Sequence, residues 1–197
     1  MKRRLLCGTK LPFSAMGGPI SETDYHQACP RMKSPMQQTK DLKLCCVRQA
    51  DVAALFSFLG NASAMRFTHV DGSLRECRRR VMVHEYFRRR DGCAPWVVRE
   101  RCTDLIIGWG GLYQDPFEPG WGFEVGYFFH PEAWGKGYAS QLVSAALAVA
   151  DDQLELPEVW GMAHPENRAS QRVLEKAGFV HARPLPERQR LLYRRSR

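Results

Sequence analysis

Residues 121–150, WGFEVGYFFHPEAWGKGYASQLVSAALAVA, decide the fold of this 197-residue chain. They read as an apolar strand over 121–129, a turn at Pro131, a glycine-bearing loop over 134–139 and an amphipathic helix. Amides at the N-terminus of a helix lack intrahelical partners, and the helix dipole favours an anion there. The stretch therefore predicts a site that holds phosphate between a strand and a helix.

The strand carries a single carboxylate, Glu124, between Gly122 and Gly126. Period-two alternation places these three residues on one face together with Phe128. A glycine inside a strand often marks a bulge or the close approach of a ligand. Glu124 is therefore either a candidate catalytic base or an edge carboxylate that faces water or pairs with an arginine.

The loop departs from the common nucleotide-binding patterns. After Gly135 and Gly137 it lacks the third glycine of the dinucleotide fingerprint, and the Gly135–Lys136 pair lacks the Ser or Thr of a P-loop. The remaining interpretation is a compact loop whose amides, from Gly135 to Ser140, surround a pyrophosphate while Lys136 adds positive charge.

A third element, HPENRASQRVLEKAGF, occupies residues 164–179. Asn167 and Ser170 are three residues apart at the start of a predicted helix, so they face the same way. Two interpretations stay open. Asn167 caps the helix and Ser170 is incidental, or both residues line a cleft beside the glycine loop.

The rest of the chain predicts the element order β-α-α-β-β-β-α-β-α-β-β. A first strand begins at Leu42, Asp51 is the expected N-cap of a helix that stops at Gly60, and Ser73 with Glu76 forms a capping box for the next helix. The expected class is α/β with mixed α+β character. We expect a central, mixed, mostly antiparallel sheet of six to seven strands flanked by about four helices.

Residues 1–40 contain four prolines and no sustained apolar period, so we expect a disordered or loosely attached tail before a single domain over 41–197. No apolar run approaches the roughly 20 residues needed to span a bilayer, and we expect a cytoplasmic protein. The seven cysteines form no CxxC pair and no zinc-finger spacing, which favours free thiols and no metal site.

The net charge of +8 includes two runs of arginine, residues 78–80 and 88–90. Consecutive residues point in different directions around a helix, so these runs favour a solvated helix face over a nucleic-acid footprint. A basic surface also suits an anionic cofactor. The oligomeric state is open, and a homodimer is compatible with the sequence.

Three blocks in this order, EVGYFFHP, WGKGYASQL and HPENRASQRVLEKAGF, resemble the GNAT superfamily of acetyl-CoA-dependent N-acetyltransferases. They are similar in particular to the RimJ/RimL-like branch, which acetylates protein N-terminal amines. The resemblance covers about Leu42 to Arg195. The loop has Trp134 where most relatives have Gln or Arg, and the RimJ/RimL-like branch often has this Trp.

The resemblance implies roles for particular residues. Glu124 would be the general base, and Ser170 would protonate the leaving thiolate, a task that water could also perform. Many relatives carry a Tyr at the position of Leu174 for this proton transfer. The remaining implied residues bind acetyl-CoA: they hold its pantetheine arm or its phosphates, and the amides near Phe128 and Phe129 also stabilise the oxyanion. This set is Phe128, Phe129, Trp134, Gly135, Lys136, Gly137, Tyr138, Ala139, Ser140, Asn167 and Arg172.

The expected function is transfer of an acetyl group from acetyl-CoA to a primary amine, either a protein N-terminal α-amine or a small-molecule amine, by direct attack. The alternative is a catalytically weak CoA-binding or protein/RNA-interaction module on the same scaffold, which the missing Tyr at Leu174 favours. The loops at 65–72 and 114–120 would shape the acceptor pocket and contain nothing diagnostic of one acceptor class.

Overall fold

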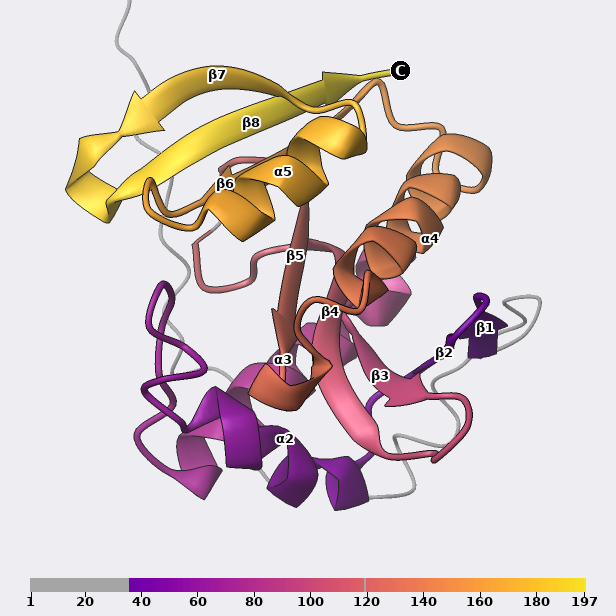
Figure 1. Ribbon diagram of the computed structural model, residues 1–197. Coiled ribbons are helices and arrows are strands. Elements are labelled where there is room, and N and C mark those ends of the chain that lie inside the picture. Colours follow the sequence, from indigo (N-terminus) through magenta and orange to yellow (C-terminus); the bar gives the residue numbers. More distant parts are fainter. Residues whose placement is uncertain (1–35, 119) are drawn as a thin grey trace, which may run out of the picture. The chain divides into compact units, whose positions relative to one another are not determined.

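The computed structural model describes residues 36–118 and 120–197 (Figure 1). One sheet contains eight strands in the order β1-β2-β3-β4-β5-β6-β8-β7. β5 and β6 are parallel, and all other neighbours are antiparallel. The strands are β1 (Met36–Gln38), β2 (Leu42–Cys45), β3 (Trp96–Glu100), β4 (Ile106–Gln114), β5 (Phe123–Phe129), β6 (Glu158–Ala163), β7 (Val180–Leu185) and β8 (Arg190–Ser196).

The predicted α/β class and mixed, mostly antiparallel sheet are confirmed, with one strand more than expected. The additional strand is β1, which pairs with β2 through the register Met36↔Cys45. It lies inside the segment expected to be a tail. Residues 1–35 of that segment lie outside the described residues.

Four α-helices occur in the described residues: α2 (Val52–Leu59), α3 (Leu74–Asp91), α4 (Tyr138–Asp152) and α5 (Arg168–Lys176). The apolar faces of α4 and α5 pack on one side of the sheet in a core that includes Leu142 and Leu174. Those of α2 and α3 pack on the other side in a core that includes Leu55 and Val81. The sheet is therefore the middle layer of three.

The capping predictions have mixed outcomes. Ser73 accepts a hydrogen bond from the Glu76 amide at 3.2 Å, as expected for the N-cap of α3, but the Glu76 carboxylate accepts from the amide of Gly72. Asp51 is the N-cap residue of α2 as predicted, but its side chain makes no capping hydrogen bond there. Its carboxylate accepts from the Arg48 amide and from the Arg99 guanidinium, which anchors β3.

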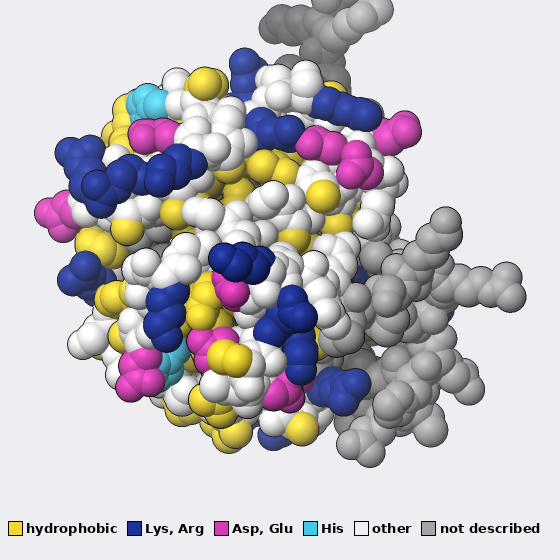
Figure 2. All heavy atoms as spheres, turned by 45° about the vertical axis from the view of Figure 1, so that its right-hand side comes forward, with side chains coloured by type: hydrophobic (Ala, Val, Ile, Leu, Met, Phe, Trp, Pro, Cys, Tyr) yellow, Lys and Arg dark blue, Asp and Glu magenta, His cyan; other side chains and the backbone are white. Residues whose placement is uncertain are grey.

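The arginine runs on α3 do not form a continuous basic face. Arg80 pairs with Asp71, Arg88 is buried and pairs with Glu85, and Arg90 pairs with its neighbour Asp91. The burial of Arg88 corrects the expectation of a wholly solvated face. On the side of the molecule in Figure 2, basic side chains are likewise interspersed with acidic and neutral ones.

β5 and β6 are in register over only two residue pairs, Glu124↔Trp160 and Val125↔Gly161. Beyond Val125, β5 continues to Phe129 without a strand neighbour on its β6 side in the described sheet, although β4 pairs with it as far as Phe129. The two parallel strands therefore diverge in the middle of the molecule.

Within the described ranges, no helix is both long enough and apolar enough to cross a membrane. Cys77 and Cys93 are buried thiols, and burial raises the pKa of each to about 12.

Candidate active site

A cleft of about 640 Å³ opens where β5 and β6 diverge. Its floor comes from β5 and β6, one wall from the start of α5, and the opposite end from the segments before α3 and between β4 and β5. The sequence-predicted residues Glu124, Phe128, Asn167 and Ser170 all line it. The structure thus brings together residues from two of the three motif blocks.

Glu124 is partly buried in this cleft. Burial raises the pKa of Glu124 to about 7, and the carboxylates of Asp115 and Glu118 act in the same direction. A hydrogen bond from the Tyr113 hydroxyl and the positive charge of Arg188 oppose the rise. A carboxyl group with a pKa near neutrality can take up and release a proton under physiological conditions, which suits a general base.

Tyr113 is a residue that the sequence interpretation missed. It lies opposite Glu124 in the β4–β5 register, and its side chain is buried. Burial raises the pKa of Tyr113 well above its usual value, so the hydroxyl stays protonated and serves as a donor to the carboxylate. A Cβ on Gly126 would lie 2.4 Å from the Tyr113 hydroxyl oxygen, so glycine at this position makes room for Tyr113.

Asn167 caps α5, and both Asn167 and Ser170 line the cleft, although the glycine loop is not part of its lining. Its Oδ1 accepts a hydrogen bond from the Ser170 amide at 3.1 Å. The Tyr127 hydroxyl donates to the carbonyl oxygen of Ser170 at 3.2 Å and so ties β5 to α5 across the cleft. Leu174, at the position where many relatives have Tyr, is buried in the core and does not reach the cleft.

The glycine loop lies outside the cleft lining, between the 3₁₀ helix Pro131–Ala133 and α4. Gly135 and Gly137 have φ angles of 77° and 78°, and a Cβ on either would meet no atom within 4 Å. Gly137 is the N-cap of α4, so the amides of Tyr138, Ala139 and Ser140 lie in its first turn, where helical partners are missing. The loop therefore presents backbone donors to open space.

Side chains fix this loop to the sheet. The Trp134 indole nitrogen donates to the Phe129 carbonyl at 3.0 Å, although 48% of Trp134 is exposed. The Tyr138 hydroxyl donates to Glu100 at 2.6 Å, and this bond raises the pKa of Tyr138 to about 12. Lys136 is half exposed, with its Nζ 3.9 Å from the same carboxylate.

The other predicted cofactor residues fall in different places. Phe128 stacks on Trp109 with ring centroids 5.7 Å apart, whereas Phe129 is buried on the opposite face. This split confirms the predicted alternation along β5. Arg172 is exposed on α5 and is not among the residues that line the cleft.

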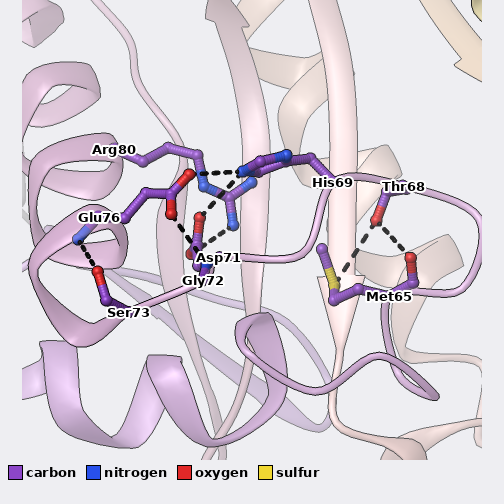
Figure 3. Close-up of polar contacts among 8 residues, drawn as sticks. All are labelled: Met65, Thr68, His69, Asp71, Gly72, Ser73, Glu76 and Arg80. Carbon is purple, nitrogen blue, oxygen red and sulfur yellow. Dashed lines mark hydrogen bonds and ion pairs between the residues drawn. The ribbon is translucent and has the colours of Figure 1, made fainter.

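The end of the cleft before α3 holds a polar network (Figure 3). His69 Nε2 lies 3.0 Å from Glu76 Oε1 and 3.7 Å from Asp71 Oδ1, and Arg80 donates to Asp71 Oδ2 at 2.8 Å. The Gly72 amide, followed by His69, lowers the pKa of Glu76. Arg80 also lies over the rings of Trp109 and Phe128, at 5.3 and 5.7 Å. The network thus connects the segment before α3 to the floor of the cleft.

Comparisons with known proteins find chains of similar sequence and structures of similar fold. An uncharacterized protein of Bacillus subtilis, YkkB, is 27% identical over 149 residues, which are 75% of this chain and 86% of YkkB. An acetyltransferase structure from Agrobacterium tumefaciens superposes with a TM-score of 0.71 and 22% identity, covering 86% of this chain and 98% of that one. The RimL ribosomal L7/L12 α-N-protein acetyltransferase in complex with coenzyme A superposes with a TM-score of 0.65 and 17% identity, covering 80% and 95%.

The acetyltransferase (GNAT) domain family matches residues 41–180, which include β2 through the start of β7 and every residue of the glycine loop. This match extends over more than half of the chain. The chain therefore belongs to the GNAT acetyltransferase family.

Proposed function

We propose that this protein transfers the acetyl group of acetyl-CoA directly to a primary amine and that residues 41–197 form the catalytic domain. The observation that carries the proposal is Glu124. It is a partly buried carboxyl group whose pKa is raised to about 7, and it lies in a cleft next to a diverging pair of parallel strands.

The chain offers a fitting site for the donor. The β6-facing side of residues 126–129 in β5 supplies backbone groups that are not used by a neighbouring strand, and these suit the amides of a pantetheine arm. The exposed amides of residues 135–140, at two glycines with positive φ and at the start of α4, suit a pyrophosphate. Lys136 adds a positive charge, and Asn167 approaches from α5.

In this proposal, different residues of the cleft act at different steps of acyl transfer. Acetyl-CoA supplies a thioester carbon that an uncharged amine attacks. Glu124 takes the proton of the incoming ammonium group, directly or through a water molecule, and Tyr113 keeps the carboxylate charged for this step. Backbone amides near Phe128 and Phe129 stabilise negative charge that develops on the carbonyl oxygen. Ser170, whose hydroxyl has no hydrogen bond within the described residues, donates a proton toward the departing sulfur.

We place the protein in the RimJ/RimL-like branch. The support is Trp134 in the glycine loop, Ser170 at the start of α5 and the similarity in fold to the RimL structure. Two acceptor classes follow from this placement: protein N-terminal α-amines and small-molecule amines.

A second candidate function is a CoA-binding module with weak catalysis. It is favoured by Leu174, which replaces the proton-donating Tyr of many relatives and is 1% exposed. In this case a polyanionic or protein partner would engage the surface instead of an amine entering the cleft.

The test is release of CoA thiol from acetyl-CoA in the presence of a panel of peptides and small amines. Transfer predicts acceptor-dependent release that Glu124→Gln reduces by about 10²-fold or more. CoA binding, measured by calorimetry, should stay within a few-fold of the parent in the same variant. Binding of CoA without release for any acceptor in the panel would support the CoA-binding module instead.

A further inference from the structure

The hairpin between β7 and β8 brings the guanidinium group of Arg190 into the cleft. Arg190 is the first residue of β8 and lines the cleft together with Arg188, which precedes it by two residues. This hairpin follows the motif blocks in sequence, and neither arginine belongs to any motif described above.

Arg190 is oriented by its own turn. Its Nη1 donates to the carbonyl oxygens of Arg188 at 3.3 Å and Gln189 at 3.0 Å. Gln189 has a φ of 52°, in the left-handed region that residues with a side chain rarely adopt. The turn therefore holds a strained backbone conformation whose two carbonyl groups fix the guanidinium plane.

The Nε and Nη2 groups of Arg190 remain available to a ligand. In the part of the chain that the structure describes, Nε and Nη2 of Arg190 have no hydrogen-bond acceptor, and no carboxylate lies within ion-pair distance. Burial lowers the pKa of Arg190, and the more distant Glu118 opposes this change. A partly buried cation without a carboxylate partner is unfavourable until an anion pairs with it.

The neighbouring arginines of the cleft are in a different situation. Arg80 is bound to the buried carboxylate of Asp71 at 2.8 Å. Arg188 pairs with Glu118 across the cleft mouth, and its guanidinium lies 5.4 Å from the centre of the Trp121 ring. Arg79 also lines the cleft and lies 5.8 Å from the centre of the Phe117 ring. The Nε and Nη2 donors of Arg190 remain available to bind an anion from outside the chain.

We propose that the acceptor carries an anionic group, a carboxylate or a phosphate, in addition to its amine, and that Arg190 binds this group while Glu124 receives the amine. The proposal rests on the proposed acetyl transfer. A planar guanidinium with two adjacent free N–H groups matches the two oxygens of a carboxylate or phosphate. Glu124 and Arg190 line the same cleft, so one zwitterionic molecule can satisfy both.

The experiment uses matched acceptors that differ only in the anion. We would compare α-amino acids with their α-amides, peptides with an acidic second residue with their amide counterparts, and phosphoethanolamine with ethanolamine. In the parent protein, at least one anionic member should be preferred in kcat/KM by about 10-fold or more. A hydrogen bond to a charged group contributes about 1.5–3 kcal/mol, so Arg190→Gln should lower kcat/KM for that member by about 10- to 10²-fold and leave its neutral partner unchanged.

Two further variants sharpen the result. Arg190→Lys keeps the charge but loses the planar fork, and should fall between the parent and Arg190→Gln. Arg183→Gln is the matched control, because Arg183 is exposed, lies over the same Trp121 ring at 5.5 Å and is not among the residues lining the cleft. It should leave the preference unchanged. A parent preference for neutral members, or an equal loss for both members in Arg190→Gln, would overturn the proposal.

A binding measurement separates this proposal from the proposed transfer. Calorimetric titration of the CoA-bound protein with the amino acid and amino amide pairs needs no turnover. Preferential binding of the anionic member by the parent but not by Arg190→Gln would support the role of Arg190 even if no acceptor released CoA. Absence of that preference in binding, together with no preference in turnover, would refute it.

Discussion

Replacing Glu124 with Gln should make the protein more stable at high pH while it removes most of the activity. Burial raises the pKa of Glu124 from the ordinary 4.5 to about 7, so the folded state binds this proton more tightly than the unfolded state. A carboxyl group of this kind supports folding fully below about pH 4.5, and its contribution is lost as the pH rises through 7. Gln has no charge to desolvate and keeps a carbonyl oxygen that can accept from Tyr113.

The magnitude follows from the shift. A change of about 2.5 pKa units corresponds to about 3 kcal/mol at 1.36 kcal/mol per unit, and this is an upper value because Glu124 is only partly buried. We therefore expect the unfolding free energy of Glu124→Gln to lie within about 1 kcal/mol of the parent's near pH 5 and to exceed it by up to about 3 kcal/mol at pH 9. Urea denaturation at both pH values measures the difference.

The same group should govern the pH dependence of the reaction. The kcat/KM of the parent should rise through about pH 7 as Glu124 becomes charged, and the residual activity of Glu124→Gln should lack this limb. A stability difference between the two proteins that does not vary with pH would refute the raised pKa. An unchanged pH–rate profile in the variant would remove Glu124 as the base.

Three further substitutions test neighbouring parts of the site. Tyr113→Phe removes a hydrogen bond that lowers the pKa of Glu124, so the acid limb of the pH–rate profile should move to higher pH. The unfolding free energy should fall by about 1 kcal/mol, and an unmoved acid limb would contradict the hydrogen bond between Tyr113 and Glu124. Ser170→Ala should lower kcat by about 10²-fold while CoA affinity is retained, whereas Ser170→Thr should keep most activity; equal rates for all three would assign the proton to water. Gly137→Ala places a side chain at φ 78°, so the unfolding free energy, measured by denaturation, should fall by about 1–2 kcal/mol. CoA binding, measured by calorimetry, should weaken, and full CoA affinity would argue against this loop as the phosphate site.

Local sequence patterns predicted those features of the fold that depend on a single residue type, such as the start of a helix. Ser73 begins α3 as predicted, because few residue types other than Ser, Thr, Asp and Asn can cap a helix with their side chain. β1 escaped prediction because its sequence, Met-Gln-Gln, has no apolar alternation and is held by pairing with β2. The carboxylate of the N-cap residue Asp51 does not make the expected capping bond, and its partner Arg99 could not be foreseen because it is 48 residues away.

In the site, too, neighbours in sequence could be recognised from the sequence, whereas contacts between distant segments could not. Glu124 stands out in the sequence because glycines lie two residues to either side of it. Tyr113 is brought opposite Glu124 by the register of β4 and β5, and Arg190 is brought into the cleft by the hairpin of β7 and β8. Nothing in the sequence around Tyr113 indicates that it will lie opposite Glu124, eleven residues later. The raised pKa of Glu124 is likewise a property of the assembled cleft, since burial is its main cause.

The separation of β5 from β6 after two residue pairs has a consequence for the protein in the absence of its donor. Residues 126–129 then form a short edge without a strand partner, at which the Phe129 carbonyl accepts only from the Trp134 side chain among the described residues. Unpaired strand edges are sites at which extended chains add and aggregates begin. Amide hydrogens along this edge should exchange with solvent faster than those that β5 directs at β4, and saturating CoA should slow them. If CoA occupies this edge as proposed, ligand-free protein should self-associate more readily than protein saturated with CoA, which light scattering can measure.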